Sequence, residues 1–529
     1  MWPEIHQVTH GNRQVDLGPN WIHGTGNNPI LNLAKELGTS LHSWEDDQTL
    51  FTEQGELLDR AEAAKLSTIF WRMVAAAFEY SKDNVEAISP DDNLLEYFTS
   101  KLEGQYRSQN LRNPSRETAG ASDSPSSTTA QDVANRVDLR PEQPESPQPE
   151  SLDREIEHLS NRQKQRILWL AEIWGSFIGD SVSRQSLKFF WLEESIDGDN
   201  LFVASTYRAI LDHVAEQPLS KAEMHFSKRA TSIETIYEDR DKSSSGTAVT
   251  TSDGSTQRYD EVVLTAPLGW LKRNHSAFIP PLPHRLRHAI EAISYGRLEK
   301  VYMTFPAAFW EDADSSTGST TSTDKPQASS ESSTSGRSPP LGFAHWMHPT
   351  YAHTTNPASW SQQAVSLSTL PAPHNHATLL FYTHGACSTH LTTLLSSTDP
   401  STHTSLLFDF FKPYITRLPY YSATSPTCIP IAVTATSWAT DELAGNGSYS
   451  NFQTGLTDGD ISIATMRDGL PDRRLWLAGE HTAPIVALGT VTGAYWSGET
   501  VAERVAAVYG MGAKETRGEE EETSVGQTI

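Results

Sequence analysis

The fold class is decided by residues 474–505, which read RLWLAGEHTAPIVALGTVTGAYWSGETVAERV. The apolar start, residues 475–478, is typical of a buried strand, and Gly479 and Glu480 follow it directly. A glycine turn at residues 489–491 then leads into a helix that we expect from about Gly493. An acid at the end of a strand suits a sugar hydroxyl, and the N–H groups at a helix start suit a carbonyl or a phosphate. A tight structural turn is the alternative interpretation.

Other segments combine strand and helix patterns. Residues 259–266 form a short apolar run before a proline, which is typical of a buried parallel strand. Residues 300–305 alternate, as a half-buried strand of a second sheet would. Residues 163–178 place apolar side chains at helical spacing, namely Ile167, Leu170, Ala171, Trp174 and Phe177. The mixture predicts an α/β or α+β chain.

A loop rich in glycine and proline lies near the start, at residues 15–29, VDLGPNWIHGTGNNP. Such loops often carry function on a scaffold that positions them. The next segment is punctuated as a helix, because Asn28 suits the cap, Pro29 the first turn and Gly38 the left-handed C-terminal position. The question raised by this loop is which part of the chain it packs against.

Composition limits the classes of partner. The chain has 529 residues and a formal net charge of -25, so it is a poor candidate for binding nucleic acid or an anionic membrane surface. This charge would suit a cationic ligand, although solubility is the alternative reason for it. The two cysteines, Cys387 and Cys428, form no zinc or redox motif and suggest a reduced compartment. No apolar stretch approaches the ~20 residues of a membrane span, and no signal peptide is visible.

Three polar segments interrupt the pattern of strands and helices. Residues 108–151 and 315–340 are rich in serine and proline, and residues 512–529 contain a run of four glutamates. Because such segments bury too little apolar surface to fold, we expect two disordered inserts and a disordered acidic tail.

Taken as a whole, residues 474–505 resemble the FAD-binding signature of the flavin-containing amine oxidases. This family includes polyamine oxidases, monoamine oxidases and flavin-type histone lysine demethylases. Four further blocks resemble family segments in the family's order: the loop at 15–29, and residues 265–290, 293–306 and 437–455. The resemblance implies a Rossmann-like FAD-binding domain, from residues 1–60, 200–290 and 431–511. It also implies an interleaved α+β substrate domain with a mixed sheet, from residues 61–199 and 291–430.

The resemblance also assigns residues to the cofactor FAD. Lys300 matches the family lysine that holds a water near flavin N5, and Glu480 matches the acid that binds the ribityl chain. Thr490 and Val491 would present backbone to the pyrimidine edge of the flavin. The same matching places four more residues near the cofactor: Gly18 and Trp21 of the opening loop, Gly479 before the acid, and Trp438.

For the substrate, the resemblance implies a small cationic amine and dioxygen. Tyr449 matches one wall of an aromatic cage, and an aromatic face favours a cation. His23 matches a substrate-site histidine of animal polyamine oxidases, with a structural role as the alternative. Glu193 and Glu194 would supply negative charge if they are not simply a solvated face. Thr490 stands where plant polyamine oxidases have a tyrosine, as in the demethylases, so the cage is expected to be wider.

The implied reaction is hydride transfer from the carbon beside an amine nitrogen to flavin N5. Imine hydrolysis and reduction of dioxygen to hydrogen peroxide follow. A polyamine is the favoured substrate, and a peptide lysine, acted on by a demethylase, is the alternative. The location is expected to be cytoplasmic, with peroxisomal import as an alternative despite an end, SVGQTI, that is not SKL.

One expected feature is missing from the 529 residues. Family members begin with a GxGxxG strand–turn–helix unit that holds the FAD diphosphate, and an RxGGR turn follows where Met1 stands here. A misplaced start, with the unit encoded upstream, is one explanation. The other is a truncated, non-catalytic protein that binds FAD weakly.

Overall fold

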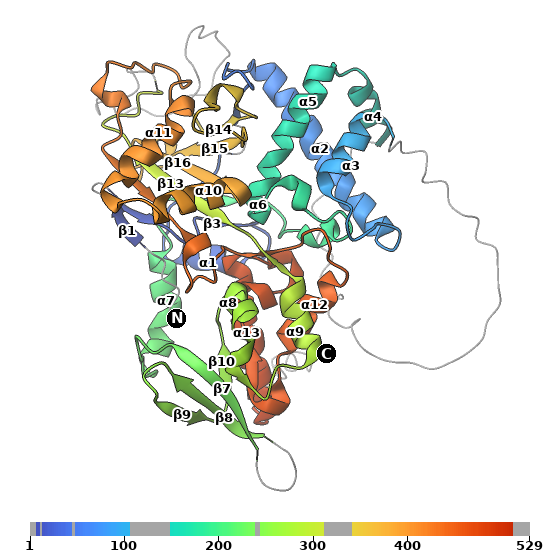
Figure 1. Ribbon diagram of the computed structural model, residues 1–529, viewed down its shortest axis with the longest axis vertical. Coiled ribbons are helices and arrows are strands. Elements are labelled where there is room, and N and C mark those ends of the chain that lie inside the picture. The colour runs from blue at the N-terminus through green and yellow to red at the C-terminus, as the bar shows by residue number, and fades with distance from the viewer. Residues whose placement is uncertain are drawn as a thin grey trace, which may run out of the picture.

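The computed structural model describes residues 7–10, 13–44, 48–105, 149–237, 244–311 and 341–511. The predicted tail, 512–529, and the predicted insert 315–340 lie outside these residues. The predicted insert 108–151 also lies outside them, except that its last three residues open helix α4 (Pro149–Glu157). The chain is elongated, with a six-stranded sheet and a helical group at one end and a smaller sheet at the other (Figure 1).

The six-stranded sheet has the order β17-β13-β16-β15-β14-β5, and it is mixed, because β14 runs parallel to β5 while the other neighbours are antiparallel. Its edge strands β5 and β17 come from segments that the sequence assigns to the FAD-binding part. The strands are β5 (Gln48–Phe51), β13 (Leu298–Thr304), β14 (Phe343–Trp346), β15 (Gln362–Ser366), β16 (Thr378–His384) and β17 (Ala432–Ala435).

Strand β13 is buried on both faces, so the prediction of a half-buried strand is wrong. Val301 and Met303 pack into one core with helices α10 (Gly385–Ser396) and α11 (His403–Ile415). Tyr302 packs on the opposite face with residues of the opening loop. The alternation read from the sequence is real, but a distant segment covers the face expected to meet water.

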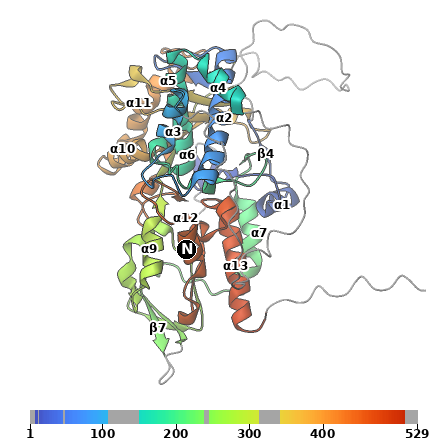
Figure 2. The ribbon, with the colours of Figure 1, turned by 90° about the vertical axis from the view of Figure 1, so that its right-hand side faces the viewer.

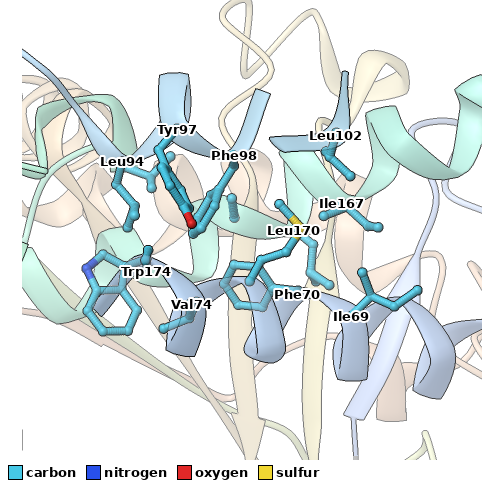
Figure 3. Packing of buried hydrophobic residues seen from close by; sticks show 14 of the residues in the cluster. Ile69, Phe70, Val74, Leu94, Tyr97, Phe98, Leu102, Ile167, Leu170 and Trp174 are labelled. Carbon is cyan, nitrogen blue, oxygen red and sulfur yellow. The ribbon is translucent and has the colours of Figure 1, made fainter. Parts of the chain in front are cut away.

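The helical group packs around one apolar core (Figure 3). It contains α2 (Arg60–Asn84), α3 (Leu94–Leu102), α4 and α5 (Asn161–Leu170). The single helix predicted over 163–178 continues from α5 as a 3-10 turn, η2 (Ala171–Trp174), and then α6 (Gly175–Ile178). Phe177, expected on the buried face, is 41% exposed, because the change of helical pitch turns it outward.

The opposite end of the molecule is built on two small sheets (Figures 1 and 2). Strand β10 (Val262–Leu264) pairs in parallel with β19 (Leu475–Leu477), which confirms the parallel direction of both predicted strands. Strand β19 is buried as predicted, but β10 is not, because Val263 is 45% exposed. The second sheet has the order β11-β7-β8-β9. The remaining elements here are β7 (Ala230–Tyr237), β8 (Ser244–Thr251), β9 (Thr256–Tyr259), β11 (Phe278–Ile279), α8 (Leu268–Arg273), α9 (His284–Ala292), α12 (Gly459–Asp468) and α13 (Val491–Val508).

The N-terminal segment joins the two ends. The hairpin β1 (Gln7–His10) and β2 (Arg13–Asp16) leads into the opening loop and then α1 (Pro29–Glu36). As predicted, Asn28 caps α1, Pro29 begins it, and Gly38 has a positive φ of 65°. A sheet of order β3-β6-β4 and helix α7 lie beside it: β3 (Trp21–Ile22), β4 (Leu41–His42), β6 (Leu201–Val203) and α7 (Arg208–Leu219).

Both cysteines are buried and free. Among the described residues, no helix is long and apolar enough to cross a bilayer.

Candidate active site

Lys300 projects from the centre of β13 towards the opening loop. Its side chain is 6% exposed, and its Nζ donates a hydrogen bond to the carbonyl of Gly18. The Lys300 backbone N–H is fixed in turn by the Thr436 hydroxyl at 2.8 Å. Burial lowers the pKa of Lys300 to about 7, although the nearby Asp16 carboxylate opposes this shift. Lys300 and Gly18, two predicted site residues, therefore meet.

The opening loop is held on the same sheet face by a buried polar group. The Tyr302 hydroxyl donates to the Asp16 carbonyl at 2.6 Å, and the Asp16 carboxylate accepts the Tyr207 backbone N–H at 2.8 Å. The Asn20 side-chain amide lies 3.3 Å from the Tyr302 hydroxyl. Because these groups are buried and bonded to one another, the loop has a defined position over β13.

Trp21 lies beside Lys300 on this face. Its indole N–H donates to the Tyr382 hydroxyl at 3.0 Å, and Tyr382 stands directly opposite Lys300 in the β13–β16 ladder. The Trp21 ring packs edge-on against Phe202, with 5.2 Å between ring centroids. The structure thus brings Gly18, Trp21 and Lys300 together.

His23 lies further along the loop, next to Asn200. Its Nδ1 is 3.2 Å from the Asn200 side-chain oxygen, and burial lowers its pKa. The neighbouring Gly24 has a φ of +75°, and a Cβ there would lie 2.2 Å from the carbonyl of Ile196. This glycine is therefore required by contact with another segment of the chain.

Glu480 follows β19, as the sequence predicts. Its carboxylate accepts the backbone N–H of Ser450 at 3.2 Å and the hydroxyl of the same residue. Burial raises the pKa of Glu480 to about 7, while the bonds from Ser450 and from the Gly489 backbone oppose the shift. The preceding Gly479 has a φ of 141° and donates its N–H to the Ser497 hydroxyl at 2.9 Å.

Helix α13 begins at Val491, two residues before the expected start. Thr490 caps it, because the Thr490 hydroxyl accepts the Gly493 N–H at 3.0 Å. The Thr492 hydroxyl donates to the side-chain oxygen of Asn28 at 3.0 Å. The start of α13 is thereby joined to the start of α1 and to the opening loop.

The small-residue face of α13 packs on the segment that carries Glu480. A Cβ on Gly493 would lie 2.0 Å from the Ala487 carbonyl and 2.7 Å from the Ala483 Cβ. Gly498, on the same helix, has nothing within 4 Å of an added Cβ. Gly493 therefore has no room for a side chain, because the segment at residues 483–487 lies against it.

Tyr449 connects the Glu480 side of the site with the helical group. Its hydroxyl donates to the Ser176 carbonyl at 2.5 Å, and Ser176 belongs to α6. Burial raises the pKa of Tyr449, and the negative charges of Glu193 and Glu480 add to that shift. A Cβ on Gly489 would lie 3.7 Å from the Tyr449 ring. Tyr449 thus lies near Glu480 and next to the turn before α13.

Glu299, next to Lys300, was missed from the sequence. It is 1% exposed, and its carboxylate accepts the backbone N–H groups of Trp438 at 3.0 Å and Ala439 at 2.8 Å. Burial raises the Glu299 pKa, and the bonds it accepts oppose the shift. Trp438 is thereby attached to β13 through its backbone. The available signal was an acid beside Lys300 in a strand whose other residues are mainly apolar, because a buried acid needs partners.

Glu193 is not part of a solvated face, which was the alternative interpretation for Glu193 and Glu194. The structure leaves Glu194 exposed, but Glu193 points inward, and its carboxylate lies 3.4 Å from the Phe452 N–H. Burial raises the pKa of Glu193 to about 7. Glu480 therefore contacts the first residue of the short strand β18 (Ser450–Asn451), and Glu193 contacts Phe452, the residue that follows this strand.

Comparison with known proteins identifies the family to which the chain belongs. A family model described as flavin containing amine oxidoreductase matches residues 5–356 and 427–506. The chain is 24% identical over 307 residues to lysine-specific histone demethylase 1 homolog 2 of Oryza sativa subsp. japonica, covering 56% of this chain and 31% of that protein. It is 23% identical over 315 residues to polyamine oxidase 4 of the same organism, covering 57% and 51%.

A shorter match, 43% identical over 65 residues, links the chain to histone demethylase-like protein A of Aspergillus fumigatus, covering 12% of this chain and 6% of that protein. The longer matches span about a third of the demethylase homolog and about half of the polyamine oxidase. Because the family model covers the segments that carry Lys300, Tyr449 and Glu480, this chain belongs to the flavin-containing amine oxidoreductases, whose cofactor is FAD.

Proposed function

We propose that this chain is an FAD-dependent oxidase of a small cationic amine, with a polyamine as the favoured substrate. FAD, when bound, supplies hydride acceptance from the carbon beside the amine nitrogen and electron transfer to dioxygen, which yields hydrogen peroxide. The observation that carries the proposal is Lys300, a buried cation that meets the opening loop on one face of the sheet.

The residues at this site suit the flavin end of FAD. Glu480 offers a carboxylate to a ribityl hydroxyl, and the start of α13 at Val491 offers backbone N–H groups to a ring carbonyl. Within the described chain, the buried Nε2 of His481 has no hydrogen-bond partner, so a polar atom beside Glu480 is free to bind a ligand. Gly18, Trp21, Gly479 and Trp438 are proposed to line the same region.

Lys300 is proposed to hold the water near the reacting carbon. An ammonium group has three donors, and the bond to the Gly18 carbonyl uses one of them. With a pKa of about 7, Lys300 exchanges a proton near neutral pH and can pass it to or from this water.

Tyr449 and His23 are proposed to position the amine. The Tyr449 hydroxyl is fixed by Ser176, so its ring presents a face that favours a cation and excludes water. His23 has a lowered pKa and therefore acts as a neutral hydrogen-bond partner at neutral pH. Thr490 in place of a tyrosine leaves the opposite wall small, which suits substituted amines.

Demethylation of a peptide lysine is the second candidate function. It is supported by the names of two of the relatives above and by Thr490 at the cage position. A non-catalytic role, in which the chain binds FAD only weakly, is the third candidate.

A peroxide assay separates these functions. The full chain, loaded with FAD, is given spermine, N-acetylspermine or a methylated-lysine peptide at equal concentrations. We expect peroxide from a polyamine, and K300M should reduce the rate by roughly 100-fold or more with FAD still bound. Peroxide from the peptide alone would establish the demethylase instead. An FAD-loaded chain that is inactive on all three substrates would contradict both the polyamine oxidase and the demethylase.

A further inference from the structure

A cavity lies between the helical group and the six-stranded sheet, and none of the predicted site residues lines it. It measures about 420 Å³. Helices α3 and α5, the loop after β14 and the start of α10 contribute to its walls. The side chains that matter below are Trp169, Glu172, Asp180, His348, Trp360 and His384.

Two tryptophans, Trp169 and Trp360, form part of the cavity wall. The Trp169 and His348 rings stack in parallel, with 5.0 Å between centroids and 6° between planes. Trp360 contributes a second indole and leans on His390, with 5.4 Å between the centroids. Two indole rings on one cavity provide electron-rich faces, which attract cations.

The charged groups of the cavity are mainly acidic. Glu172 and Asp180 both line it, and the described lining residues include neither lysine nor arginine. Burial alone would raise the pKa of Glu172. Bonds with His384 and Ser181 outweigh that effect and lower it, so Glu172 is ionised at neutral pH.

Not every polar group of the cavity has a hydrogen-bond partner. The His384 Nε2 lies 3.6 Å from the Glu172 carboxylate, and its buried Nδ1 has no hydrogen-bond partner within the described chain. His348 and Ser359 line the cavity with positive φ values of 44° and 53°. Strained residues of this kind gather where a ligand is held.

We propose that this cavity is a second ligand site, which binds the alkylammonium group of a small organic cation between the indoles and Glu172 and Asp180. The site is independent of the proposed oxidation, because its residues are separate from Lys300, Tyr449 and Glu480. It lies one helical turn from the active site, since Glu172 precedes by four residues the Ser176 whose carbonyl holds Tyr449.

Binding of choline to the FAD-loaded full chain tests this site. Choline carries a quaternary ammonium group, and dimethylbutanol, its uncharged isostere, is the control ligand. Calorimetry should show one choline site, with the isostere bound at least about tenfold more weakly. The intrinsic tryptophan fluorescence should change on titration, because two indoles line the cavity.

Three variants assign the site. W360L removes one aromatic wall and should weaken choline binding by about tenfold. W71L, at a tryptophan of α2 outside the cavity, is the matched control and should bind choline like the wild type. K300M should also leave choline binding unchanged, which separates this cavity from the proposed active site.

The proposal is overturned if W360L binds choline as tightly as the wild type, if K300M abolishes binding, or if the isostere binds equally well. Should W360L fail to fold, E172Q provides the same test, because it removes a charge without changing volume. E172Q that folds and keeps full affinity would contradict the role of the carboxylate.

Discussion

The charge of Lys300 depends on its position between the sheet and the opening loop. Its ammonium group is taken out of water, and the Gly18 carbonyl and the Asp16 carboxylate replace only part of that hydration. Burial of the Lys300 ammonium group therefore lowers the stability of the folded chain. It also gives the site a lysine that can hold or release a proton, because its pKa is near 7.

The stability of the chain should reveal this penalty through pH. The pKa of Lys300 is about 7 in the folded chain and ordinary, near 10.5, when unfolded. The penalty is therefore fully present below pH 7 and disappears between about pH 7 and 10.5, where the unfolded state binds more protons. Each pKa unit corresponds to about 1.4 kcal/mol, so the whole change is on the order of a few kcal/mol.

Replacing Lys300 by methionine removes the titrating group. The Tm of K300M should exceed that of the wild type at pH 7, and the difference should shrink steadily towards pH 10. Scanning calorimetry at several pH values measures this. K412M, at an exposed lysine of α11, controls for the loss of a charge and should follow the wild type. A K300M difference that is constant with pH would contradict the account.

At the scale of elements, α13 positions Glu480 through close packing. Gly493 lies against Ala487, and Ser497 holds the Gly479 N–H, so the helix and the segment of the acid form one unit. The unit has no room for a larger side chain at position 493.

Two alanine substitutions on α13 test this packing. G493A would force a Cβ into the Ala487 carbonyl and should cost about 1–3 kcal/mol of the free energy of unfolding. It should also lower the fraction of chain that binds FAD. G498A is the matched control, because its Cβ meets nothing and the helix should gain about 0.5–1 kcal/mol. Denaturant unfolding and flavin absorbance measure both; equal effects of the two variants would refute the packing argument.

Elements with local signals were predictable from the sequence. The caps of α1 follow from residues within a few positions of one another, and β10 and β19 each follow from a short apolar run. Their pairing joins segments about 210 residues apart and was not predictable in this way. Features that depend on contacts between segments far apart in the sequence were not predictable. The opening loop covers the second face of β13 from about 280 residues away, and Glu299 finds its partners at Trp438. The sequence placed Lys300 on its strand, but its contact with Gly18 needed the fold.

At the scale of the whole molecule, the net charge of -25 should act on a cationic substrate before it binds. Long-range attraction between exposed charges is screened by salt, with a Debye length of about 10 Å at 0.1 M. The effect grows with the charge of the substrate.

Raising the ionic strength should therefore lower kcat/KM several-fold more for spermine than for a monoamine of comparable reactivity. Steady-state peroxide assays across a salt series measure this. Equal loss for both substrates would show that the net charge has no role in recognition.

We propose that Lys300, Tyr449 and Glu480 surround a flavin that oxidises an amine. Anaerobic mixing of the FAD-loaded chain with spermine tests it most directly. The account predicts that the visible flavin band bleaches, with Lys300→Met bleaching much more slowly, and that admitting air restores the band and releases peroxide. A fully loaded chain whose flavin stays oxidised under excess spermine, N-acetylspermine and simple monoamines would contradict the account.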